Sequence, residues 1–151
     1  MSSTINDVAA QLRKTVYDAS AQFFKMNDDD TSARPEPTKW SRKELLGHLI
    51  DSASNNHQRF IRAQQVEELI TPKYDQEFWV SSQGYAQAQW ISLVTLWREY
   101  NLHLANVIER IPEEAAQHRL VIGDNAPATL EFVVEDYLSH LKHHLQQIMP
   151  E

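Results

Sequence analysis

The spacing of apolar residues along this chain is the spacing of amphipathic helices. Near the N-terminus, apolar side chains recur at steps of three and four residues, a period that predicts a first helix. These positions are Ile5, Val8, Ala9, Leu12, Val16, Ala19 and Phe23. The same spacing recurs after Trp90 and predicts a third helix along one face, which ends before Pro112.

Two further helices are marked by residues that favour a helix start. Ser41 and Glu44 have the spacing of a capping box, and Trp40 stands where a hydrophobic staple would, so a second helix is predicted from there. Thr129 is a good N-cap for a fourth helix, which is predicted to run to about Met149.

The segments between these helices are rich in turn residues, prolines and charges. They cover about residues 26–39, 67–89 and 112–129, and the only strand-like stretch in them is the short RLVI at 119–122. Four long helices joined by two longer connections predict an all-α four-helix bundle, in which residues 1–151 form a single domain.

Composition narrows the possible functions. The chain has 151 residues and carries 14 Lys and Arg against 21 Asp and Glu, so its net charge is −7 and no nucleic-acid partner is expected. It contains no Cys, which excludes disulfides, zinc–thiolate sites and a cysteine nucleophile. The first residues lack the features of a signal peptide, and no apolar stretch is long enough to span a bilayer, so we expect a cytoplasmic protein without membrane contact.

Three histidines fall on faces that helical geometry turns toward the core. His140 and His144 lie within about 40° of each other on the last helix, because successive residues are separated by roughly 100°. His143 lies on the flank of that sector, and His48 stands on the inner stripe of the second helix. His57 lies about half a turn from His48 and is expected to be exposed.

A metal site explains this arrangement better than packing does. Each histidine alone could be a core residue with a hydrogen-bond partner or a half-exposed residue, and for His48 alone the core interpretation is favoured. Three inward imidazoles on two helices would each need a partner, whereas one shared cation satisfies all three. The Glu-x-x-His motifs of di-iron bundles and the His-Glu-x-x-His motif of metalloproteases are absent from the sequence. Haem ligation remains open.

Several motifs together resemble the DinB superfamily. They are KWSRKELLGHLIDS, DQEFW, IPEEA and YLSHLKHHLQQI, and the resemblance runs from about Pro37 to Met149. It implies an up-down-down-up four-helix bundle, often a homodimer, that holds a divalent metal ion through three histidines. On the matching motifs those ligands are His48, His140 and His144.

The resemblance leaves the reaction open. Some members of the family are enzymes that use a low-molecular-weight thiol, which implies a thiol S-transferase with a small-molecule substrate. Alternatives are a metal-dependent hydrolase and a non-catalytic, stress-associated metal-binding protein. Zinc or nickel is the expected metal, with iron or copper also compatible with three imidazoles. A catalytic site would keep an open coordination position, whereas a structural site would have a fourth protein ligand.

Other polar residues near the predicted centre are candidates for substrate or ligand contacts. Asn55 and Arg59 share a sector with His48 and are predicted substrate-binding residues, although a polar helix end in solvent is an equal alternative. Asp51 and Asp136 could accept a ring N–H and orient a ligand, but solvated flank residues are the favoured interpretation. The aromatic residues of the connections are expected to cover the core rather than form a pocket. They are Trp40, Tyr74, Phe78, Trp79 and Tyr85.

Overall fold

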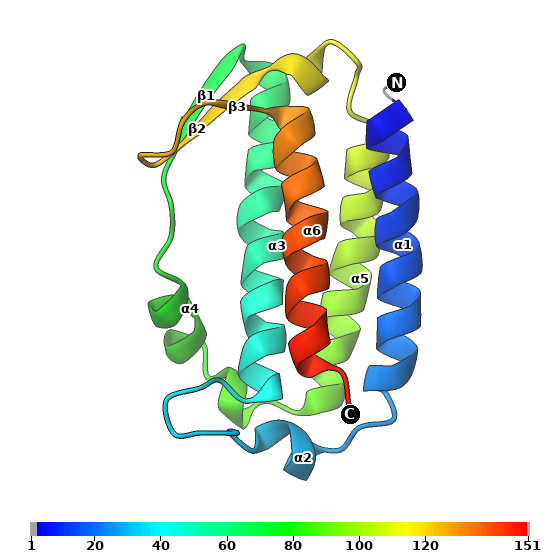
Figure 1. Cartoon of the computed structure of the whole chain (residues 1–151), viewed down its shortest axis with the longest axis vertical. Helices are drawn as coiled ribbons and strands as arrows, with labels where there is room; N and C mark the ends of the chain where they lie inside the picture. The colour runs from blue at the N-terminus through cyan, green and yellow to red at the C-terminus, as the bar shows by residue number, and fades with distance from the viewer. Residues whose placement is uncertain (1–2, 151) are drawn as a thin grey trace.

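The computed structural model describes residues 3–150, and four long helices lie side by side within them (Figure 1). They are α1 (Ser3–Phe23), α3 (Arg42–Gln65), α5 (Trp90–Glu109) and α6 (Leu130–Ile148). α1 packs on α5 and α6, and α3 packs on the same two helices. In Figure 1, α1 and α6 run downward and α3 and α5 run upward. The predicted mostly helical fold is confirmed.

The apolar positions that predicted the helices form the core. All seven apolar residues of the predicted first-helix pattern are buried in α1. The ring of Phe23, at the end of α1, lies 5.6 Å from each of the Trp90 and Trp97 rings of α5. The Trp90 indole also donates a 2.6 Å hydrogen bond to the carbonyl of Phe23, which satisfies its buried N–H.

The two helix starts that matter for the site are capped as predicted. The Glu44 backbone N–H donates to the Ser41 hydroxyl at 3.2 Å, and the Ser41 backbone N–H donates to the Glu44 carboxylate at 3.0 Å, which completes the capping box. At α6, the Phe132 N–H donates to the Thr129 hydroxyl at 3.1 Å. These caps fix where α3 and α6 begin, and so which faces their histidines present.

The connections contain short elements that the sequence patterns did not predict. These are two short α-helices, α2 (Asp28–Ser32) and α4 (Gln76–Ser82), and two 3₁₀ turns, η1 (Tyr85–Gln87) and η2 (Ala115–Gln117). Asn27 and Asp75 each cap one of the short helices through a side-chain oxygen.

A small sheet corrects the all-α prediction. β1 (Glu68–Thr71) pairs in parallel with β2 (Arg119–Ile122), and β2 pairs antiparallel with β3 (Ala128–Thr129). β2 is the RLVI stretch. Strands of two to four residues have too few positions for an alternating pattern to be recognised in the sequence. The pairing of β1 with β2 also joins segments about fifty residues apart. In Figure 1 the sheet lies beside the end of α3 at which β1 begins.

Within residues 3–150, no helix has both the length and the apolar composition that a membrane crossing requires.

Candidate metal centre

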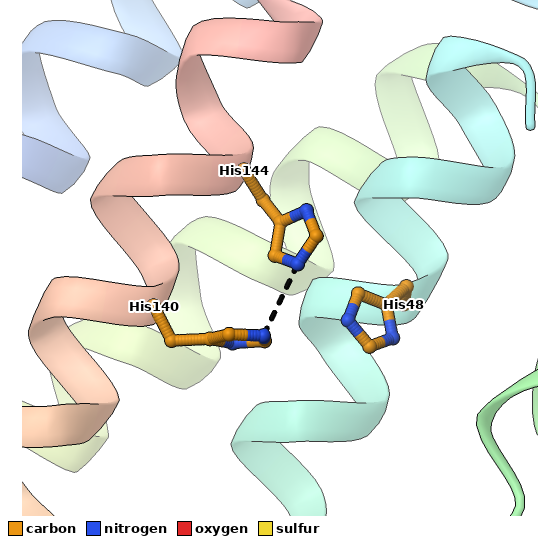
Figure 2. Close-up of side chains that lie close together, drawn as sticks. All are labelled: His48, His140 and His144. Atoms are coloured by element: carbon orange, nitrogen blue, oxygen red, sulfur yellow. Dashed lines mark hydrogen bonds between the residues drawn. The ribbon is translucent and has the colours of Figure 1, made fainter.

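Three imidazoles from α3 and α6 meet between the two helices. Figure 2 shows one ring nitrogen of His48 facing the rings of His140 and His144, while its other nitrogen faces away from them. One nitrogen from each ring can be chosen so that all three lie within 4.8 Å of one another. The Nε2 atoms of His140 and His144 are 3.1 Å apart. The ring centroid of His48 lies 5.6 Å from that of His140 and 4.9 Å from that of His144.

His48 is held deep in the bundle by the inner stripe of α3. His48 is only 1% exposed, next to the buried Leu49, and the centroid of the Trp40 ring is 5.1 Å from that of its own ring. Its Nδ1 atom has no hydrogen-bond partner among the described residues. Leaving this buried polar atom without a partner costs stability.

His140 and His144 come from consecutive turns of α6, and buried Leu141 and Leu145 fix the face that they share. This i, i+4 spacing brings their ring centroids to 4.5 Å. His143 is exposed and does not belong to the cluster, although its ring centroid is 5.4 Å from that of His144.

Gln147 fixes the tautomer of His144. The Nδ1 atom of His144 lies 2.9 Å from the Oε1 atom of Gln147, an oxygen that can only accept, so Nδ1 carries the proton and donates it. The lone pair of the ring is therefore on Nε2, which faces His140. Metal-binding histidines are usually oriented in this way, by donating the N–H of the ring nitrogen that does not bind the metal to a neighbouring group.

Burial favours the neutral form of His48 and His140. It lowers the pKa of His48 from 6.5 to about 4, with further lowering from the nearby His144 and His140. Burial likewise lowers the pKa of His140, a shift that His144 reinforces and that the carboxylate of Asp136 partly opposes. Neutral imidazoles are the form that binds metal ions, so the site favours ligation at neutral pH.

The cluster fits a divalent metal ion. Zn–N bonds of about 2.0–2.1 Å at tetrahedral angles place ligand nitrogens about 3.3 Å apart, close to the 3.1 Å between His140 and His144. Among the described residues no fourth His, Asp or Glu joins the group. Three imidazoles without a thiolate or carboxylate suit zinc, nickel, iron or copper.

Asp51 is held by Tyr85 and Gln83, and no hydrogen bond joins it to His48. Its Oδ1 atom accepts a 2.7 Å hydrogen bond from the Tyr85 hydroxyl and a 2.8 Å bond from Gln83, while its buried Oδ2 atom has no partner among residues 3–150. Burial raises the pKa of this carboxyl group. The Tyr85 ring can approach because residue 47 is a glycine: a Cβ there would lie 2.1 Å from the ring.

A cavity of about 300 Å³ opens beside the cluster, between α3, α6 and the sheet, and His140 forms part of its wall. Arg59, a predicted substrate contact, lines it. Asn55, the second predicted contact, does not line it, and its amide donates to the backbone carbonyl of Asp51. The next residue, Asn56, lies in the wall instead.

A second cavity, of about 430 Å³, reaches the cluster through His144 and shares no wall residue with the first. Its other wall residues are Pro35, Lys39, Trp40, Leu45 and Gln147. Two of the five aromatic residues expected to cover the core thus line cavities, Trp40 here and Tyr74 in the first. Tyr85 is buried as expected, and Phe78 is 64% exposed.

Comparison with known proteins decides the family. The sequence profile of the DinB superfamily matches residues 11–148, a range that contains all three clustered histidines and both cavities. The chain belongs to the DinB superfamily.

The similar proteins include one curated relative and two solved structures. A "putative metal-dependent hydrolase" of Oceanobacillus iheyensis is 25% identical over 123 residues, which cover 82% of this chain and 70% of that protein. YfiT from Bacillus subtilis, described as a probable metal-dependent hydrolase with an unusual four-helix bundle topology, superposes with a TM-score of 0.82 at 22% identity, over 98% of this chain and 86% of YfiT.

The second structure is a mycothiol-dependent maleylpyruvate isomerase. It superposes on this DinB chain with a TM-score of 0.77 at 12% identity, over 98% of this chain and 63% of the isomerase. At these identities both structures establish a shared fold only.

The other histidines of this DinB chain lie outside the cluster. His57, predicted to be exposed, is half-buried: its Nδ1 lies 2.8 Å from the Tyr100 hydroxyl, and its ring centroid is 5.5 Å from that of His103. His118 contacts the carbonyl of Ala63 through Nδ1 at 2.7 Å.

The sequence patterns missed Gln147 and Asn56. Gln147 could have been found from its position, because it stands three residues after His144 and therefore on the next turn of the same face. No comparable sequence pattern marks the sheet residues that line the first cavity, because their position depends on which strands pair.

Proposed function

We propose that His48, His140 and His144 bind one divalent metal ion, zinc or nickel, in an enzyme that transfers a low-molecular-weight thiol to a small-molecule substrate. The observation that supports this most directly is the convergence of three imidazoles, without a fourth protein ligand among the described residues, beside two cavities. Structural metal sites are closed by a fourth ligand, whereas catalytic sites keep a position open.

The residues of the chain prepare the centre in three ways. Burial keeps His48 and His140 neutral, and Gln147 directs the lone pair of His144 inward. The cavities at His140 and His144 provide separate places for two organic molecules. A divalent ion bound there would hold a thiol as its thiolate at neutral pH. The chain has no Cys, so the thiol must come from a co-substrate.

A metal-dependent hydrolase is the second candidate, because the Oceanobacillus relative and YfiT carry that description. In that case the open position would activate a water molecule. The two separate cavities favour the transferase, since hydrolysis needs a place for only one organic substrate. A non-catalytic metal-binding protein is favoured less, because its site would need no adjacent cavities.

The proposal includes the arrangement of the whole chain. We propose one domain over residues 1–151, an up-down-down-up bundle, a homodimer and a cytoplasmic location. Arg59 is the proposed substrate contact of the first cavity, together with Asn56.

A coupled assay tests the function. Metal-loaded protein would be mixed with a panel of small thiols and a chromogenic aryl halide. In the expected reaction a C–S bond forms, the C–halide bond breaks, and the thiol proton goes to solvent. We expect thiol-dependent turnover that disappears in His48→Ala. Hydrolysis of ester substrates without any thiol would support the hydrolase instead, and metal binding without either activity would support the non-catalytic alternative.

A further inference from the structure

The positively charged Arg59 lies in the wall of the first cavity and has no carboxylate partner among the described residues. Its Nη2 atom donates a 3.1 Å hydrogen bond to the carbonyl of Pro72, which uses one of its five N–H donors. Among residues 3–150, no carboxylate lies within ion-pair distance of Arg59. Burial lowers the pKa of the Arg59 guanidinium.

Other arginines of the chain show the contrast. Arg13, Arg34, Arg98 and Arg119 each form an ion pair with a glutamate. Arg62, one turn beyond Arg59 on α3, is exposed and bonds to Gln58, so water can solvate its charge. Arg59 and Arg42 are both partly buried without a carboxylate partner, and each donates to a backbone carbonyl. Arg59 differs from Arg42 in lining the first cavity, which gives a ligand access to it.

The rest of the cavity wall also offers hydrogen-bond donors. Asn56, Asn125 and Tyr74 line it with Arg59. Burial raises the pKa of Tyr74 to about 12, so its hydroxyl is neutral and can donate. The acidic wall residue Asp136 is exposed and lies on α6, four residues before His140, so an anion would bind on the α3 side, away from it.

The cavity extends from the metal centre to Arg59. His140 belongs to the three-histidine cluster and to the cavity wall, as Arg59 does. Arg59 stands eleven residues after His48 on α3, so about three helical turns separate their backbones. A molecule that contacts both the centre and Arg59 must therefore carry its anionic group away from the end that lies at the centre.

We propose that this cavity binds the thiol co-substrate, with its sulfur at the three-histidine centre and a carboxylate on Arg59. The inference rests on the proposed function, because it takes a thiol as one of the two substrates. The second cavity suits the electrophile better, since Trp40, Leu45 and Pro35 give it an apolar wall. Arg59 supplies recognition here, through the two parallel hydrogen bonds that a guanidinium forms with a carboxylate.

Binding of glutathione to the Co²⁺-loaded protein tests this assignment, with affinity measured by calorimetry and the thiolate-to-cobalt absorption band showing whether the sulfur reaches the metal. Glutathione is a thiol with two carboxylates, its diethyl ester keeps the thiol without them, and S-methylglutathione keeps the carboxylates without the thiol. We expect glutathione to bind the unaltered protein more tightly than either analogue. Arg59→Ala should weaken glutathione binding about tenfold to hundredfold and should leave binding of the diethyl ester unchanged.

Arg62→Ala is the matched control, because it removes a guanidinium from the next turn of the same helix without touching the cavity. It should bind glutathione like the unaltered protein, and Arg59→Lys should recover part of the affinity lost in Arg59→Ala. Equal binding of glutathione and its diethyl ester, equal weakening by the two alanine variants, or no glutathione binding at all would overturn the assignment. Failure to take up Co²⁺ would instead overturn the proposed function, and it is detected before any thiol is added.

Discussion

The amide oxygen of Gln147 lies 2.9 Å from Nδ1 of His144 and directs the Nε2 atom of that ring toward His140. The contact explains how a half-exposed imidazole near the end of α6 is held in one tautomer and one orientation. Side chains that orient a metal-binding histidine in this way affect metal affinity without touching the ion.

Gln147→Ala is therefore expected to weaken metal binding about tenfold to hundredfold. The His144 ring would lose its acceptor and could adopt the other tautomer. Competition with a chromogenic chelator measures the change, and Gln146→Ala, on the exposed face one residue earlier, is the control. Equal affinities in the two variants would mean that Gln147 does not hold the ligand ring.

The two neighbouring imidazoles of α6 should differ sharply. His144→Ala removes one of the three clustered rings and is expected to abolish stoichiometric metal binding, whereas His143→Ala removes an exposed ring outside the cluster and should retain most of it. Metal analysis of protein purified without a histidine tag measures both. A greater loss in His143→Ala would show that the ligand pair is His140 with His143.

The close packing of Tyr85 on Gly47 gives a stability prediction. Alanine is about 1 kcal/mol more favourable than glycine within a helix, so Gly47→Ala should stabilise α3 on propensity alone. Because its Cβ would lie 2.1 Å from the Tyr85 ring, we expect a net loss of about 1–3 kcal/mol instead. Urea unfolding measures the change, with Gln58→Ala on the exposed side of α3 as control. A stabilised Gly47→Ala protein would contradict the packing.

Stability of the metal-free protein should fall in mild acid. Burial lowers the pKa of His48 to about 4 in the folded chain, whereas the unfolded chain binds a proton near pH 6.5. The neutral ring thus contributes stability above about pH 6.5, and this contribution is lost as the pH falls toward 4. Thermal melts of chelator-treated protein should show it. His48→Gln, which cannot titrate, should have a flatter profile, and identical pH profiles would argue against a neutral buried His48.

The long helices and the three-histidine cluster were predictable because both follow from local periodicity. An i, i+4 pair such as His140 and His144 shares a face whatever the tertiary structure, and the capping box at Ser41 fixes the register of α3 and so the inward direction of His48.

The sheet and the half-burial of His57 were not predictable in the same way. β1 and β2 are four residues each and are joined only by long-range pairing, for which the sequence carries no local signal. His57 lies on a polar face of α3, but that face meets Tyr100 and His103 of α5, so its burial depends on how two helices pack. Asn56 rather than Asn55 lines the cavity for a similar reason, since a one-residue step rotates a side chain by about 100°.

The most direct measurement of the central claim is a titration of chelator-treated, untagged protein with Zn²⁺ and with Ni²⁺, repeated for His48→Ala and His57→Ala. Both substitutions remove one imidazole from α3, but only His48 belongs to the cluster. We expect the unaltered protein and His57→Ala to bind one equivalent tightly, and His48→Ala to lose at least tenfold in affinity. Equal affinity in the two variants, or no tight equivalent in the unaltered protein, would contradict a metal centre formed by His48, His140 and His144.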